Sequence, residues 1–107
     1  RTYFGANKLA EGANSKLSYV EVTNAQHFDS LLATPGFAER FVPIHWYNIQ
    51  ALNAMWNHLK TGTPLPASQV VRTQPRGTGA PALAAGNLTA ISTQPAPADA
   101  ITFDANT

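Results

Sequence analysis

The segment Leu-Ser-Tyr-Val-Glu-Val at residues 17–22 limits most strongly how this chain can fold. Its apolar residues are Leu17, Tyr19, Val20 and Val22. They fall on both faces of a β-rich stretch, as a strand inside a parallel sheet requires. The polar residues 23–26 then end the predicted strand. We therefore expect an α/β fold in which this strand is covered on both sides.

A single histidine, His27, follows the strand directly and precedes a predicted short helix at residues 28–33. Open α/β sheets bind ligands beyond the carboxyl ends of their strands. An α/β-hydrolase presents the last member of its Ser-His-acid triad in this way, so we predict His27 to be a catalytic base. The alternative is that His27 only caps a helix or lies in a surface loop, because spacing alone does not separate these roles.

The other two triad residues are not expected in this chain. In the chain order of this fold the serine and the acid both precede the histidine. No Gly-x-Ser-x-Gly pattern occurs in the sequence. Asp29 is interpreted as a first-turn residue of the short helix, where the helix dipole favours a carboxylate. We expect a larger N-terminal portion of the same enzyme to carry the serine and the Asp or Glu.

A longer helix is predicted at residues 44–60, with Pro43 in its first turn and Gly62 just beyond its end. Its apolar arc is broad and contains Ile44, Tyr47, Ile49, Ala51, Leu52, Met55, Trp56 and Leu59. Such a wide arc contacts more than one neighbour. The 107 residues, of which only 12% are charged, offer few partners for it. This helix again indicates a larger body of protein.

The remaining segments have weaker signals. Residues 1–15 are predicted to form a surface loop with a short helical turn near Leu9. Residues 69–73 are predicted to form an edge strand, and residues 100–104 a last short strand. We divide the chain into residues 1–77, the C-terminal segment of an α/β-hydrolase-like catalytic domain, and 78–107, an extended Ala-, Pro- and Thr-rich tail packed on it.

Composition excludes several classes of function. The net charge is +1 with scattered basic residues, which argues against nucleic-acid binding. No apolar run approaches the ~20 residues that span a bilayer. Cysteine is absent, so neither a disulfide nor a thiolate zinc site can form. His45 and His58 lie 18 and 13 residues from their preceding histidines, spacings that match no metal-ligand pattern, so we predict no metal site.

Four blocks of the sequence resemble the C-terminal region of D-(-)-3-hydroxybutyrate oligomer hydrolases. They are Tyr19–Asp29 (YVEVTNAQHFD), Phe41–His45 (FVPIH), Ala51–Trp56 (ALNAMW) and Gly62–Thr73 (GTPLPASQVVRT). The resemblance covers residues 17–77 and implies cleavage of short 3-hydroxybutyrate oligomers to monomers during polyhydroxybutyrate degradation. It also implies that His27 stands where that family has its proposed catalytic histidine.

The implied reaction is serine-type ester hydrolysis, which needs neither a metal nor an organic cofactor. We expect a secreted or periplasmic enzyme whose targeting region lies outside this chain. Two alternatives remain at this point. One is another extracellular esterase of the feruloyl-esterase or tannase type, and the other is a non-catalytic C-terminal interaction module.

Overall fold

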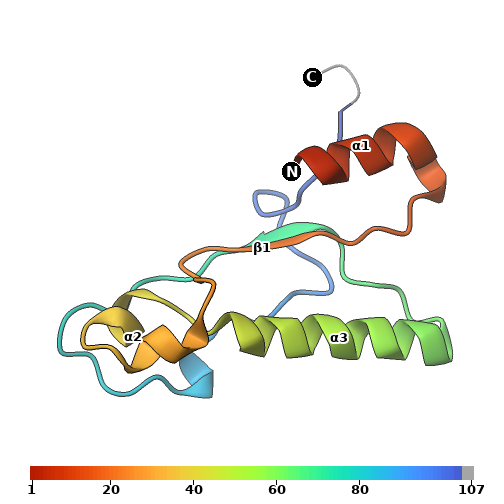
Figure 1. Ribbon diagram of the computed structural model, residues 1–107. Coiled ribbons are helices and arrows are strands. Elements are labelled where there is room, and N and C mark those ends of the chain that lie inside the picture. The colour runs from red at the N-terminus through yellow and green to blue at the C-terminus, as the bar shows by residue number, and fades with distance from the viewer. Residues whose placement is uncertain (105–107) are drawn as a thin grey trace.

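The computed structural model describes residues 1–104, which form three layers (Figure 1). The α-helices are α1 (Thr2–Glu11), α2 (Phe37–Arg40) and α3 (Ile44–Thr61), the strands are β1 (Val20–Val22) and β2 (Gln69–Val71), and the 3-10 helices are η1 (Gly12–Asn14), η2 (Asp29–Ala33) and η3 (Ala85–Asn87). Helix α1 lies on one side of the strands and α3 on the other. No helix among residues 1–104 is long and apolar enough to cross a membrane.

Strands β1 and β2 pair in parallel, with Val20 opposite Gln69 and Val22 opposite Val71. The opposite edge of β2 is also paired, because Gln69 forms an antiparallel bridge with Ala100. Strand β2 is thus the second and last strand of a two-stranded sheet, as the prediction of an edge strand expected, with this single bridge on its outer side. The sequence did not reveal the bridge, because it depends on a residue 31 positions away.

The last predicted strand is not formed. Within residues 100–104 only Ala100 bridges to β2. The chain then turns towards α1, where a Cβ atom added to Gly5 would lie 3.7 Å from the Phe103 ring. This contact draws the tail away from β2 after one bridge. Residues 105–107 of the predicted tail lie outside the described residues.

The two faces of β1 contact different helices, in keeping with the alternation of side chains along a strand. Tyr19, just before β1, stacks on Phe4 of α1 with ring centroids 5.7 Å apart. Val20 and Val22 pack instead against the core formed by Val42, Tyr47 and Val71. The predicted coverage of both faces is confirmed, although only one edge of β1 is paired within residues 1–104.

Helix α1 replaces the predicted N-terminal loop, so that prediction was wrong. The helix contains Gly5 and has no side-chain hydrogen bond at its N-terminus, so local signals for it are weak. It is stabilised by tertiary contacts: Phe4 is buried against Tyr19, and the Arg1 guanidinium binds the Glu21 carboxylate through two nitrogens at 2.6 and 2.7 Å. Residues 2–11 therefore become helical mainly because Phe4 is buried against Tyr19.

Helix α3 confirms the predicted long helix and extends it by one residue to Thr61. Gly62 adopts a left-handed conformation with φ 72°, which ends the helix as predicted. Pro43 stands just before the helix with an extended ψ of 118°, not within its first turn. The predicted short helix at 28–33 is observed as the 3-10 helix η2. Tyr47 of α3 is buried, which raises the pKa of its hydroxyl group.

The Arg1–Glu21 ion pair predicts an acid-dependent loss of stability. Hydrogen bonds from Arg1 lower the pKa of Glu21 from 4.5 to about 2, aided by the Tyr19 hydroxyl 3.0 Å away. Because the folded pKa lies below the unfolded one, the contribution is fully present above pH 4.5 and is lost as the pH falls towards 2. The difference in thermal midpoint between wild type and Glu21→Gln should shrink over this range.

The control is Glu11→Gln, since Glu11 is exposed and forms no ion pair within residues 1–104. Its thermal midpoint should differ from that of wild type by the same small amount at every pH. A Glu21→Gln difference that stays constant down to pH 2 would contradict the role of the ion pair.

Candidate functional site at the carboxyl end of the strand pair

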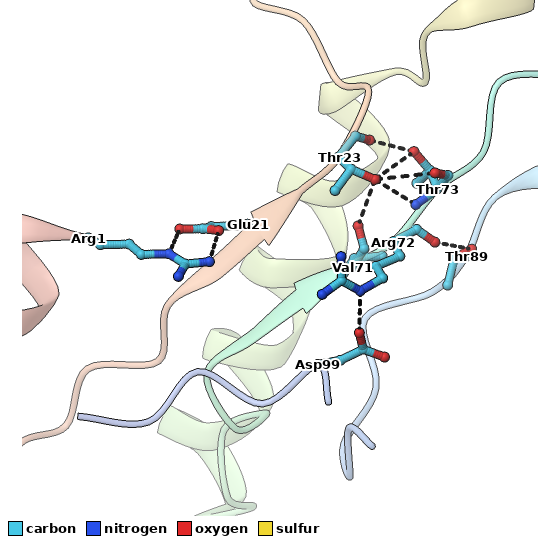
Figure 2. Close-up of polar contacts among 8 residues, drawn as sticks. All are labelled: Arg1, Glu21, Thr23, Val71, Arg72, Thr73, Thr89 and Asp99. Atoms are coloured by element: carbon cyan, nitrogen blue, oxygen red, sulfur yellow. Dashed lines mark hydrogen bonds and ion pairs between the residues drawn. The ribbon is translucent and has the colours of Figure 1, made fainter. Parts of the chain in front are cut away.

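The carboxyl ends of β1 and β2 are joined by two threonines (Figure 2). Thr73 donates its backbone N–H to Thr23 Oγ1 at 2.8 Å, and its hydroxyl group donates to the Thr23 carbonyl at 2.5 Å. Thr23 also donates its backbone N–H to the Val71 carbonyl at 3.0 Å. Thr73 is only 7% exposed, so these bonds are shielded from water. The network fixes where both strands end.

Asn24 turns the chain away from β2 immediately after this network. It adopts a left-handed conformation with φ 55°, which asparagine tolerates better than most residues. Its side-chain amide donates to the Thr73 carbonyl at 2.8 Å, and its own carbonyl accepts from Val42 N at 2.9 Å. The next residue, Ala25, then forms a parallel bridge with Val42. Asn24 thus directs the following loop towards the start of α3.

His27 lies at a bend two residues beyond that bridge, and its side chain is exposed. Its ring contacts Phe28 edge to face, with centroids 4.5 Å apart and an interplanar angle of 83°. No hydrogen bond to the imidazole is formed within residues 1–104. Both ring nitrogens are therefore available to other groups, such as a nucleophile on one and a carboxylate on the other.

Asp29 anchors the other end of the His27 loop. Its Oδ1 and Oδ2 atoms accept the backbone N–H groups of Ile44 and His45, both at 2.8 Å. The carboxylate therefore caps α3, which has no capping side chain of its own because Pro43 precedes it. Asp29 is the first residue of η2, as predicted, but the sequence reasoning missed this cap. The sequence offered one signal for this cap. Proline at position 43 has no side-chain group to cap the predicted helix, so the first N–H groups need an acceptor from elsewhere in the chain.

The two anchors hold the His27 loop against one short segment. The Ala25–Val42 bridge fixes its beginning, and the Asp29 cap fixes its end. The free span between the anchors is only three residues, 26–28. An exposed imidazole on such a supported loop can exchange protons without reorganising the backbone. Gln26, inside the span, has a buried side-chain nitrogen without a partner in residues 1–104.

The other two histidines are distributed along α3. His45 is exposed at the start of the helix, and its backbone N–H donates to Asp29. His58 lies near the opposite end, where its Nδ1 is 2.8 Å from the Thr63 carbonyl. Among residues 1–104, no group of three or more His, Asp or Glu side chains is arranged to hold a metal ion. The structure does not bring the three histidines into one cluster.

The arginines near the strands are engaged in structural contacts. Arg72 binds the Asp99 carboxylate at 2.7 Å, and its carbonyl accepts from the Thr89 hydroxyl group (Figure 2). Arg76 donates to the carbonyls of Ala38 and Pro81. Both side chains thus tie distant loops to the end of β2.

The comparisons with known proteins identify the family of this chain. The sequence profile of the family described as 3HB-oligomer hydrolase matches residues 1–107. The chain belongs to the 3HB-oligomer hydrolase family.

Three relatives illustrate the match, and each is named D-(-)-3-hydroxybutyrate oligomer hydrolase. The proteins from Polaromonas sp. (strain JS666) and Polaromonas naphthalenivorans are 62% identical over 109 residues, and the protein from Paraburkholderia xenovorans is 60% identical over 98 residues. These matches cover 99%, 99% and 89% of this chain. The chain spans only about 15% of the length of the relatives. No solved structure matches it.

The Asp29 cap gives a prediction for the His27 loop. Asp29→Ala should lower the free energy of unfolding by about 0.5 to 2 kcal/mol, because two N–H groups at the start of α3 lose their acceptor. Asp29→Asn, which keeps one acceptor oxygen, should lose less. Denaturant unfolding measures both changes, and amide exchange at Ile44 and His45 reports the cap directly.

Ser30→Ala is the matched control, since Ser30 is the exposed neighbour of Asp29 and its side chain forms no hydrogen bond within residues 1–104. Equal losses for Ala at positions 29 and 30, or unchanged exchange at Ile44 and His45 in Asp29→Ala, would show that the carboxylate does not hold the helix start.

Proposed function

We propose that this chain carries the general base of a serine-type carboxylic ester hydrolase and that His27 is that base. The observation that supports the proposal is the placement of His27. It is exposed just beyond the carboxyl end of β1, on a loop held at both ends by hydrogen bonds. Membership in a hydrolase family supports the role of a general base for this imidazole.

The proposed substrates are dimers and short oligomers of 3-hydroxybutyrate, which the enzyme cleaves to monomers. The names of the relatives support this choice. The proposed architecture is that of an α/β-hydrolase-like domain, to which this chain contributes the C-terminal region. A larger N-terminal portion of the same enzyme then supplies the nucleophilic serine and the acid, in the chain order typical of that fold.

The proposed reaction proceeds in two steps. His27 takes the proton of the serine hydroxyl group as the serine oxygen attacks the ester carbonyl, and backbone N–H groups stabilise the oxyanion that forms. His27 then returns the proton to the leaving 3-hydroxy group, which leaves an acyl-enzyme. Water, deprotonated by His27, attacks this ester, and His27 returns the proton to the serine oxygen as the second product leaves. The sequence of steps requires no redox or metal chemistry.

The contacts around His27 suit this role. Proton transfer requires the imidazole to remain within hydrogen-bond reach of the serine oxygen in both steps. The Ala25–Val42 bridge and the Asp29 cap limit movement of the loop backbone. The T-shaped contact with Phe28 packs one ring against the imidazole. Because Asp29 is already bonded to two N–H groups, the triad acid is expected from elsewhere.

The test is the release of 3-hydroxybutyrate from its linear dimer by a protein of the relatives' length that carries this sequence. His27→Ala should lower turnover by about a thousandfold or more while the thermal midpoint is retained. His45→Ala is the matched control, because His45 is also exposed and its side chain forms no hydrogen bond within residues 1–104. It should retain near-normal turnover.

Undiminished turnover of His27→Ala would remove this histidine from the mechanism. A panel of aromatic esters tests the substrate separately. Rapid cleavage of feruloyl or galloyl esters, without action on hydroxybutyrate dimers, would contradict the proposed substrate while keeping the esterase chemistry.

A further inference from the structure

One edge of β1 has unused hydrogen-bonding groups. Gln69 donates its N–H to the Tyr19 carbonyl at 2.9 Å, and Thr23 donates to the Val71 carbonyl at 3.0 Å. The backbone groups of alternate residues point to opposite edges of a strand, so those of Val20 and Val22 point away from β2. Among residues 1–104 no group accepts or donates a hydrogen bond to them.

Nothing in the strand itself protects this edge. Proteins usually blunt an open edge with proline, lysine, a bulge or an inward-pointing charge. Strand β1 contains neither proline nor lysine, and its one charged residue, Glu21, is bound to Arg1 on the face that α1 covers. A strand of this composition, with both faces covered and one edge bare, is typical of the interior of a larger sheet.

The face of α3 that points away from the strands is also exposed to solvent. Tyr47 and Ala54 lie on the face that packs towards the strands, and Tyr47 is 2% exposed. The exposed apolar residues on the rest of the helix are Ile49, Leu52, Met55, Trp56 and Leu59. Leu52, Trp56 and Leu59 are 64%, 62% and 71% exposed. Figure 1 shows no described segment along this side of α3. A contiguous apolar surface of this kind marks an interface.

An apolar groove connects the two bare surfaces. It has a volume of about 270 Å³ and is lined by residues that include Val20, Ala51, Ala54, Met55 and Ile91. Val20 lies at the open edge of β1, and Met55 lies on the exposed arc of α3. The edge, the groove and the helix face therefore form one continuous surface.

We propose that the remaining part of the hydrolase packs on this surface and that a strand of that part pairs with the open edge of β1 through Val20 and Val22. The chain spans about 15% of the length of its relatives, so a protein of that length has ample chain to fill the surface. A two-stranded parallel sheet is too small to be stable alone, which favours a strand of the same enzyme over a second copy. The inference rests on the larger enzyme of the proposed function, but not on the catalytic role of His27.

The first test is amide exchange at single residues in a protein of the relatives' length. The Val20 and Val22 amides should exchange about a hundredfold or more slowly than unprotected amides, close to the rate at Thr23, which bonds to β2 in any case. Exchange of Val20 and Val22 at the rate of an exposed loop would overturn strand pairing.

The second test is photo-crosslinking with p-benzoylphenylalanine at Leu52, with Asn53 as the control on the adjacent position of the same helix. Leu52 should crosslink to a peptide outside this segment with the product at monomer mass, at least about tenfold more efficiently than Asn53. A product at dimer mass would assign the helix face to a second copy and overturn the proposal, as would equal labelling from both positions. Amide exchange uses the unmodified protein, so a misfolded crosslinking variant leaves the test intact.

These readouts are independent of activity. If His27→Ala retains turnover while Val20 and Val22 are protected, the catalytic proposal fails and the docking surface stands. If His27→Ala loses turnover while both amides exchange freely, the docking surface fails and the catalytic role stands.

Discussion

The parallel pairing of β1 with β2 is the constraint on which the rest of this structure depends. It joins residues 20–22 to residues 69–71, so the whole segment between them must leave the sheet and return on one side. Helix α3 makes that return and buries Tyr47 against the strands. The Thr23–Thr73 network then fixes where both strands end. Burial and hydrogen bonding thus act on the same few residues, and the position of the histidine loop follows from them.

The histidine loop shows how a small number of polar contacts can support an exposed side chain. Asn24 accepts a left-handed backbone conformation because its amide bonds to Thr73, and Asp29 uses both carboxylate oxygens on the start of α3. Neither residue bonds to His27 within residues 1–104. They hold the backbone on either side of it and leave the imidazole exposed. The proposed catalytic role requires both properties, a fixed loop backbone and an imidazole that stays free to exchange protons.

The sheet and helix α3 also share one property, since each is packed or paired on one side only within residues 1–104. Within residues 1–104, strand β1 is paired with β2 on one edge only, and α3 is packed on the strands but has an exposed apolar outer face. A groove between Val20 and Met55 connects the two. Both features receive a single explanation if the larger hydrolase continues the sheet beyond β1 and covers α3. The exposed apolar area of α3 then has the same origin as the unused backbone groups of β1.

The sequence by itself determined the elements whose signals are local. Apolar residues on both faces specified the strand before His27, and the helical period together with Gly62 specified α3, because these patterns depend only on neighbouring residues. Tertiary structure decided helix α1, the bridge from β2 to Ala100 and the Asp29 cap. Each of these depends on a contact between distant residues: Phe4 with Tyr19, Gln69 with Ala100, and Asp29 with Ile44. No local pattern encodes such contacts, because the free energy that stabilises them appears only when the chain has brought both partners together.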